Sequence, residues 1–298
     1  MIRLTVRQME YFDALARTLH FGRAAALAGV SQPALSSQIA EMEERLGRQL
    51  FERGGRAVRM TDEGLALQPR IERVLSELQE IEREARQGPL AMEGRFRLGI
   101  IPTVAPYLLP RILPEIRARF PRLQLELREA VTSTLIEETA ARRLDAFIAA
   151  VPLDAPALVT EVLFADRIFL AVPAGDPAFA APPVPPESPE LERLMLLEEG
   201  HCMREQALAV CGSVKPVAMA SYGATSLTTL LQMVAHGMGV TLVPEMAREA
   251  AGEMRDLKIV PFAEPMPERI ICLAWRRNRA RQEECLELAA IIREVNGR

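Results

Sequence analysis

The sequence predicts three parts in chain order: a small all-α domain at residues 1–60, a linker helix at residues 61–90 and an α/β domain at residues 91–298. Three observations predict this division. Apolar residues recur at helical spacing in the first part, a heptad stripe follows, and strand-like and helix-like segments alternate after Arg95. The breaker pair Gly88–Pro89 separates the second part from the third.

The composition is that of a globular protein. Of the 298 residues, 49% are hydrophobic and 26% are charged, enough for more than one core. No apolar stretch approaches the roughly 20 residues that cross a bilayer, and no apolar block follows Arg3 and Arg7, as it would in a signal peptide. We therefore expect a cytoplasmic protein without a membrane partner, whose four cysteines are reduced thiols.

A helix, a tight turn and a second helix are predicted within the first domain. Apolar residues repeat at helical spacing between Leu15 and Leu27 before Gly29 interrupts the pattern. Ser31 is a suitable N-cap for the second helix, and Pro33 falls in its first turn, where a missing N–H costs nothing. The second helix buries one face and begins its other face with Gln32, Ser36 and Ser37.

Polar side chains at the start of a second helix suit the reading of DNA bases, because Gln can pair with adenine and hydroxyl groups can reach bases or phosphates. Although the net charge is −4, residues 1–60 hold nine arginines against six acidic residues, so this domain is locally basic. The spacing alone is equally consistent with a small helical bundle whose polar face is solvated.

The linker segment predicts a long helix. Thr61, Asp62 and Glu63 resemble a helix start with acidic residues at the positive end of the dipole. Apolar residues then step by four and three, which predicts a short coiled coil and hence a dimer. A stripe of this length could instead pack on the chain's own first domain. It contains Leu67, Ile71, Val74, Leu78, Ile81 and Ala85.

The remaining chain has the alternating pattern of an α/β domain. The Pro-rich run at residues 182–189 is expected to be an exposed loop. Helices are predicted at residues 110–120 and after Ser133. Strands are predicted at residues 96–101, 123–128, 145–151, 168–172, 194–198 and 240–243.

Two cysteines, Cys202 and Cys211, bound a segment rich in Ala and Leu that is predicted to be helical. Over that separation a continuous helix rises roughly 13 Å and turns about 900°, which puts the two sulfurs on opposite faces. A disulfide tolerates Cα separations only up to about 7 Å. Either the pair never forms a disulfide, or its formation requires the helix to unwind, which describes a switch.

Cys202 is the better nucleophile of the two. It follows the Gly200 turn at the expected start of a helix, beside His201, where a thiolate is favoured. On these residues alone, both thiols could instead be small buried side chains without a redox role.

The other cysteines and histidines carry no predicted chemistry. Cys272 lies in an apolar run and Cys285 on the last amphipathic helix, so both are expected to be structural. His20 and His236 have no Cys or His partner at ligand spacing, so we expect no metal and no cofactor.

Residues 21–39, FGRAAALAGVSQPALSSQI, with Glu43, Leu46–Gly47 and Leu50–Arg53, resemble the signature of the LysR family of transcriptional regulators. The resemblance implies a winged helix-turn-helix domain that binds double-stranded DNA, and an α/β sensor of the periplasmic-binding-protein type. Its two lobes would be residues 92–165 with 268–298, and residues 166–267. The implied DNA contacts are Ser31, Gln32, Pro33, Ser36 and Ser37 in the groove, with Arg53 and Arg56 on phosphates.

Residues 198–202 with Cys211, residues 101–110 and residues 224–227 resemble the OxyR branch of the family along essentially the whole chain. This implies a hydrogen-peroxide-sensing activator of the oxidative stress response rather than an enzyme. By the resemblance, Cys202 is oxidised by peroxide to a sulfenic acid and Cys211 resolves it as a reversible disulfide. A homotetramer built as a dimer of dimers, RNA polymerase and a thiol reductant such as a glutaredoxin or thioredoxin are the implied partners.

The same resemblance implies a peroxide pocket around Cys202. Thr103 and Thr132 would hydrogen-bond peroxide or a water, His201 would flank the thiol, and Arg269 would favour the thiolate. Read without it, Thr103 and Thr132 are equally well strand-end caps and Arg269 a surface strand residue. Glu205 completes the predicted pocket, although the family usually has Asp there.

Two other functions remain open. A LysR-type regulator could sense a small metabolite between its lobes with redox-inert cysteines, in which case a Cys202→Ser protein would still regulate. A thiol peroxidase could use the same pair, in which case the sensor half alone would consume peroxide at catalytic turnover. Against the enzyme stands the first domain, which catalysis would not need.

Overall fold

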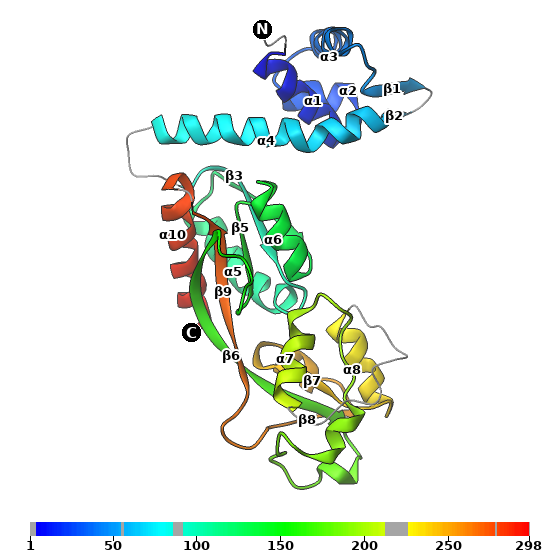
Figure 1. Ribbon diagram of the computed structural model, residues 1–298, viewed down its shortest axis with the longest axis vertical. Coiled ribbons are helices and arrows are strands. Elements are labelled where there is room, and N and C mark those ends of the chain that lie inside the picture. Colours follow the sequence, from blue (N-terminus) through cyan, green and yellow to red (C-terminus); the bar gives the residue numbers. More distant parts are fainter. Residues whose placement is uncertain (1–3, 55–56, 86–91, 212–225, 278, 298) are drawn as a thin grey trace. The chain divides into compact units, whose positions relative to one another are not determined.

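The computed structural model describes residues 4–54, 57–85, 92–211, 226–277 and 279–297. The chain divides into two compact units. The first is Met1–Gly88 with Ala141–Arg143, and the second is Pro89–Ala140 with Leu144–Arg298. Figure 1 labels most helices and strands of both units, and each unit is described by itself below.

The first unit is a winged helix-turn-helix followed by a long helix, as predicted. Ser31 caps α3 by accepting a hydrogen bond from the Ala34 amide at 3.4 Å, and Gly29 makes the preceding turn with φ +67°. The Glu43 carboxylate accepts the Leu50 and Phe51 amides at 2.8 and 3.0 Å and so begins the wing. The elements are α1 (Val6–Thr18), α2 (Phe21–Leu27), α3 (Gln32–Leu46), β1 (Phe51–Gly54), β2 (Ala57–Met60) and α4 (Asp62–Ala85).

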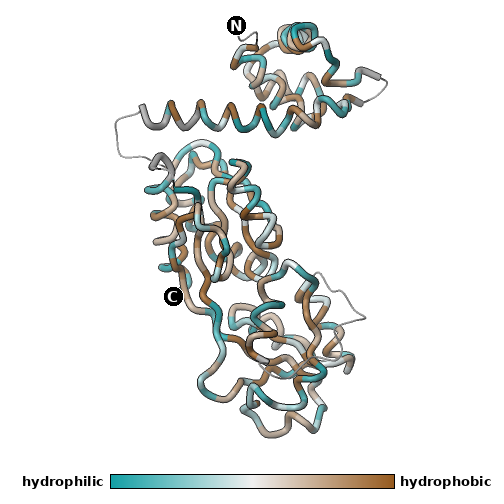
Figure 2. The backbone as a smooth tube through the Cα atoms, in the orientation of Figure 1, coloured by the Kyte–Doolittle hydropathy of each residue, from teal (hydrophilic) through white to brown (hydrophobic). Residues whose placement is uncertain are grey.

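Helix α4 uses its apolar stripe in two ways. Near its start, Ile71 is buried and Leu67 packs beside it on the core of the first unit. Farther along, Val74 is 41% exposed and Ile81 is 61% exposed. Hydrophobic residues recur along the coloured part of this helix (Figure 2). The stripe therefore packs on its own domain at one end and leaves apolar side chains uncovered at the other.

The second unit is built on one curled, seven-stranded mixed sheet with the order β4-β3-β5-β9-β6-β7, in which β8 also pairs with β6. Figure 1 shows α6 and α10 on opposite sides of β5 and β9. The elements before residue 180 are β3 (Gly94–Ile100), α5 (Ala105–Arg119), β4 (Leu123–Glu129), α6 (Thr132–Ala140), β5 (Ala146–Ala150), β6 (Leu158–Pro173) and η1 (Pro177–Phe179). Those after it are η2 (Pro189–Arg193), α7 (Cys202–Cys211), α8 (Leu227–Ala235), β7 (Thr241–Pro244), η4 (Glu245–Ala247), α9 (Arg248–Gly252), β8 (Leu257–Val260), β9 (Glu268–Arg276) and α10 (Arg279–Asn296).

Two hydrophobic cores share this sheet, which gives the two-lobed fold of the periplasmic-binding-protein type. One core draws on residues 92–163 and 271–295, and the other on residues 168–262. Strand β6 serves both, because residues 158–167 pair with β9 while residues 168–173 pair with β7 and β8. The chain thus passes between the lobes along β6 and β9.

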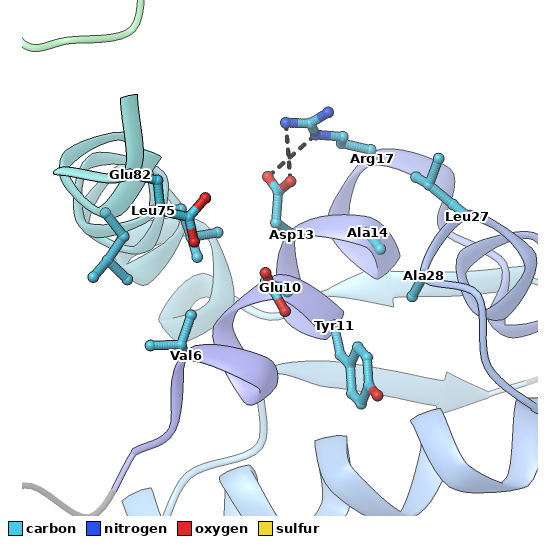
Figure 3. A pocket seen from close by; sticks show the side chains of 11 residues that line it. Val6, Glu10, Tyr11, Asp13, Ala14, Arg17, Leu27, Ala28, Leu75 and Glu82 are labelled. Atoms are coloured by element: carbon cyan, nitrogen blue, oxygen red, sulfur yellow. Dashed lines mark hydrogen bonds and ion pairs between the residues drawn. The ribbon is translucent and has the colours of Figure 1, made fainter. Parts of the chain in front are cut away.

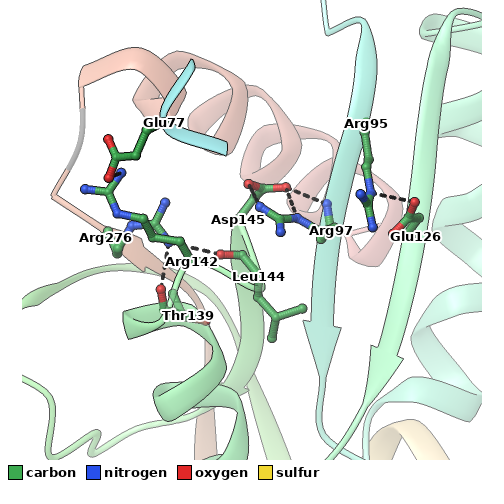
Figure 4. A network of polar contacts seen from close by, with 9 residues as sticks. All are labelled: Glu77, Arg95, Arg97, Glu126, Thr139, Arg142, Leu144, Asp145 and Arg276. Atoms are coloured by element: carbon green, nitrogen blue, oxygen red, sulfur yellow. Dashed lines mark hydrogen bonds and ion pairs between the residues drawn. The ribbon is translucent and has the colours of Figure 1, made fainter. Parts of the chain in front are cut away.

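Polar contacts anchor the first strands of this sheet (Figure 4). The Asp145 carboxylate accepts the Arg97 amide at 2.7 Å and its guanidinium at 3.1 Å. Arg276 donates to the Thr139 and Leu144 carbonyls at 2.7 and 3.2 Å. The buried Asp145 carboxylate and two backbone carbonyl groups thereby gain hydrogen-bond partners near the start of β5.

Three predicted elements differ from the structure. Residues 194–198 form isolated bridges rather than a continuous strand, one of them from Leu194 to Val240. Helix α5 begins at Ala105, earlier than predicted, and so contains Pro110 and Pro114. Both prolines are exposed, so water can hydrate the backbone carbonyl groups that a proline, having no N–H, leaves without a hydrogen bond. Strand β6 extends far beyond residues 168–172 through its pairing with β9.

Among the described residues, no helix combines the length and apolar character that crossing a membrane requires.

Candidate functional site

Cys202 is the first residue of α7 and lies where the two lobes approach. The turn before it needs Gly200, whose φ of +91° is strained for other residues. The side chain is half-buried and packs against the core of the first lobe, although α7 itself belongs with the second. Cys202 is a free thiol in this position.

Burial raises the pKa of the Cys202 thiol above its ordinary value, and this is the largest influence on it. The Arg269 charge, the Thr132 hydroxyl and the amides of Ala150 and Met203 act in the opposite direction. The sequence predicted a favoured thiolate from the helix N-terminus. That expectation is wrong for the net shift of the Cys202 pKa, because desolvation outweighs the groups that stabilise the thiolate.

Arg269 is a buried residue of β9 rather than a surface one, with only 2% of its area exposed. Its Nη1 donates to the Thr103 hydroxyl at 2.8 Å, and its Nη2 donates to the Thr103 carbonyl at 3.2 Å. Its charge lowers the pKa of Cys202. The structure therefore brings Thr103, Arg269 and Cys202 into one site.

Thr132 begins α6 and joins the same site. Its hydroxyl lowers the pKa of Cys202. Its oxygen is nevertheless buried without a conventional hydrogen bond to any described group. A buried hydroxyl usually has a hydrogen-bonding partner, and the Cys202 thiol is the group on which this one acts.

The other two predicted pocket residues lie differently. His201 is buried, and burial lowers its pKa against the opposing influence of Glu198, which favours the neutral ring. Glu205 is exposed in the first turn of α7 and is not among the described groups that act on the Cys202 pKa. His201 is thus a buried neighbour of Cys202 in the chain, whereas Glu205 is exposed.

Sequence reasoning missed two residues here. Asp166 forms a wholly buried ion pair with Arg269, at 2.8 Å from its Nη2. Tyr107 of α5 packs against the core of the second lobe, and burial raises its pKa while Thr228 and Arg269 oppose the shift. Tyr107 stood within the motif at residues 101–110, but Asp166 had no local signal.

Cys211 ends the same helix that Cys202 begins. Across ten helical residues the two Cα atoms are roughly 13 Å apart, beyond the reach of a disulfide. The Cys211 side chain lies outside the described residues. The backbone alone shows that α7 must open before these two cysteines can bond.

The two remaining cysteines are inert. Cys272 is fully buried, and burial is the main cause that raises its pKa to about 12. Cys285 is equally buried in α10. Within the described part of the chain, no group of three His, Cys, Asp or Glu side chains could hold a metal ion.

The second candidate site is the surface of α3. Ser31 and the first two residues of α3, Gln32 and Pro33, are exposed, as is Ser37, whereas Ser36 is half-buried. Arg53 lies in β1 but its side chain is outside the described residues, as is the whole of Arg56. Sequence reasoning left Arg59 aside, and it is exposed on β2. This surface is the start of a helix with several exposed polar residues.

Comparison with known families identifies both units. Residues 6–65 match the bacterial regulatory helix-turn-helix protein of the lysR family, and residues 91–297 match the LysR substrate binding domain. A relative from Streptomyces viridosporus, described as a probable hydrogen peroxide-inducible genes activator, is 39% identical over 98% of this chain and 94% of its own. The DNA-binding transcriptional dual regulator OxyR of Escherichia coli is 37% identical over 97% and 95%.

Solved structures resemble the whole chain as well. A full-length cysteine variant of OxyR from Pseudomonas aeruginosa has a TM-score of 0.74 and 32% identity, covering 98% of this chain and 96% of its own. A hydrogen-peroxide-bound cysteine variant of OxyR from Corynebacterium glutamicum has a TM-score of 0.70 and 30% identity, covering 99% and 94%. The likeness extends over both units.

Proposed function

Because this chain belongs to the LysR family of bacterial transcriptional regulators, we propose that it binds promoter DNA and senses hydrogen peroxide through Cys202 and Cys211. The observation that carries the proposal is the surroundings of Cys202. A half-buried thiol faces a buried cation, Arg269, and a buried hydroxyl, Thr132, that lacks a conventional partner. The relatives named for hydrogen peroxide support the same signal.

The first step is the oxidation of Cys202. Its thiolate attacks one oxygen of hydrogen peroxide, so that an S–O bond forms as the O–O bond breaks. The other oxygen leaves as hydroxide and takes a proton to become water. Thr103 and Thr132 are the hydroxyl groups that would hold the peroxide oxygens, and Arg269 stabilises the anionic sulfur before attack.

The second step forms the disulfide. The Cys211 thiolate attacks the sulfur of the Cys202 sulfenic acid, so that an S–S bond forms as the S–O bond breaks, and the hydroxide that leaves takes a proton to become water. Because both residues belong to α7, this bond can form only as the helix unwinds. The oxidised segment must therefore fold differently, and a thiol reductant such as a glutaredoxin or thioredoxin would return it to the helix.

The DNA contacts proposed are Ser31, Gln32, Pro33, Ser36 and Ser37 in the groove, with Arg53 and Arg56 on phosphates. Exposed polar groups at the start of α3 support the first set. The change that follows oxidation would reach the promoter and RNA polymerase through a homotetramer that is a dimer of dimers.

A groove in the first unit supports a dimer formed through α4. It has a volume of about 430 Å³ and lies between α1, the end of α2 and α4 (Figure 3). Val6, Leu27, Leu75 and Leu78 provide apolar walls, and Glu10 and Glu82 provide charge. The exposed Val74 and Ile81 of a second copy are suitable occupants.

The proposed role is regulation rather than catalysis. A thiol peroxidase must restore its cysteine at every turnover, whereas here the resolving residue can reach Cys202 only after a helix has opened. Peroxide consumption would therefore stop after one equivalent per subunit unless a reductant acts.

The test is peptide mass mapping of the reduced full-length protein before and after stoichiometric hydrogen peroxide, with free thiols blocked. We expect rapid appearance of a Cys202–Cys211 disulfide, and a trapped sulfenic acid at Cys202 in Cys211→Ser. Cys285→Ser is the matched control and should leave the disulfide intact. Unmodified thiols under this challenge would instead support a regulator that senses a metabolite between its lobes.

A further inference from the structure

The buried ion pair between Asp166 and Arg269 neutralises charge and also holds both side chains in a fixed orientation. The two residues stand directly opposite each other in the antiparallel pairing of β6 with β9. Asp166 Oδ2 accepts from Arg269 Nε at 2.9 Å and lies 2.8 Å from Nη2. Asp166 Oδ1 accepts the Met246 amide of η4 at 3.1 Å. Both carboxylate oxygens are therefore engaged by fixed donors.

The rigid guanidinium of Arg269 passes this fixed orientation on to Thr103. It is planar and rigid, so holding two of its nitrogens determines the direction of the third. The third nitrogen, Nη1, donates to Thr103 Oγ1 at 2.8 Å. Because that bond occupies a lone pair, the Thr103 hydroxyl keeps its hydrogen for another acceptor. Thr103 is 2% exposed, so bulk water does not compete strongly for that hydrogen.

We propose that Asp166 is the positioning residue of the peroxide site: it orients Arg269 so that the Thr103 hydroxyl is presented as a hydrogen-bond donor beside Cys202. This inference rests on the proposed function, since it assigns the donor to the peroxide that Cys202 reduces. It identifies a residue of the site that acts through two others and does not touch the thiol.

Asp166 also offsets part of the Arg269 charge, and this gives the proposal a distinctive signature. Without the carboxylate, the unopposed guanidinium would stabilise the Cys202 thiolate more strongly and lower the thiol pKa. By charge alone, the loss of Asp166 should then speed oxidation. By positioning, the loss should slow it, because Arg269 no longer directs Thr103. A lower thiol pKa combined with slower oxidation is therefore expected only if Asp166 positions the site.

The experiment uses full-length Asp166→Asn. The rate of Cys202 oxidation by hydrogen peroxide and the pH dependence of Cys202 alkylation are both followed by peptide mass mapping. We expect oxidation at neutral pH to slow roughly tenfold, while the alkylation midpoint moves to lower pH. Asp145→Asn, at a second buried Asp–Arg pair, is the matched control and should change neither readout.

Oxidation as fast as that of the parent protein would overturn the proposal, as would slower oxidation with an unmoved alkylation midpoint. If Asp166→Asn does not fold, Asp166→Asn with Arg269→Gln removes both charges and is compared with Arg269→Gln alone. The double variant should oxidise no more slowly than Arg269→Gln alone, because Asp166 positions the site only through Arg269. A further loss of rate in the double variant would contradict this.

Failure of the proposed function is distinguishable from failure of this inference. A parent protein that peroxide does not oxidise at Cys202 would reject peroxide sensing. The alkylation midpoint would still report whether Asp166 restrains the Arg269 charge.

Discussion

The Arg269 guanidinium donates a hydrogen bond to the Thr103 hydroxyl at 2.8 Å inside the protein, although the two residues are 166 positions apart in the chain. Thr103 follows β3 and Arg269 lies in β9, so the bond depends on the assembled sheet. The buried Arg269 cation thus has a neutral partner, the Thr103 hydroxyl, in addition to the Asp166 carboxylate. The reactivity of the thiol therefore depends on groups from several parts of the second unit.

Thr132→Val should slow the oxidation of Cys202. The substitution keeps the side-chain shape and removes a hydroxyl that lowers the thiol pKa. With that pKa higher still, less thiolate is present at neutral pH, and the rate should rise only at more alkaline pH. The measurement is the pH profile of Cys202 alkylation. Thr134→Val in the same helix should leave the profile in place, and an unmoved profile in Thr132→Val would refute the role of this hydroxyl.

Cys272→Ala should leave the peroxide response intact. Burial raises the pKa of this thiol to about 12, so it carries almost no thiolate at neutral pH. The substitution should cost on the order of 1 kcal/mol of unfolding free energy, because it removes a packed atom from the core. Thermal unfolding measures the cost and peptide mapping measures the response. Loss of the Cys202–Cys211 disulfide in this variant would show that Cys272 takes part.

Gln32→Ala should reduce discrimination between operator and altered operator DNA by about 1–3 kcal/mol, provided that Gln32 pairs with a base. The residue is exposed at the first position of α3, so the unfolding free energy should change little. Binding to both sequences, titrated at constant salt, measures the effect.

Ser31→Ala is the informative companion to that variant. Ser31 caps α3, and its loss should cost about 1 kcal/mol of stability. Affinity should then fall for both DNA sequences alike. A loss of discrimination as large as that of Gln32→Ala would mean that Ser31 also reads a base.

Ile81→Glu should weaken the dimer. Ile81 is 61% exposed on α4, and burying a carboxylate in a helix pair is costly. Sedimentation of the parent protein and the variant over a concentration series would show the shift toward monomer. Leu286→Glu on α10 is the control, since Leu286 is 39% exposed on another element. Equal association of parent and variant would exclude this part of α4 from the interface.

The sequence determined the features that depend on local spacing. The Ser31 cap, the Gly29 turn and the apolar face of α3 follow from backbone geometry, so the helix-turn-helix could be predicted before any contact was known. The same holds for α7, where residue spacing alone separates Cys202 from Cys211. The alternation of strands and helices likewise predicted the α/β class, but not the length of β6.

Only the tertiary structure decided which groups meet at Cys202. Asp166 and Arg269 become partners through the register of β6 with β9, and register between distant strands leaves no mark in local periodicity. The burial of a side chain likewise depends on all of its neighbours in the folded chain, so local sequence does not reveal it. It made Arg269 an interior residue, left Glu205 in solvent and raised the Cys202 pKa against the favourable helix terminus, because desolvation acts on the folded thiol as a whole.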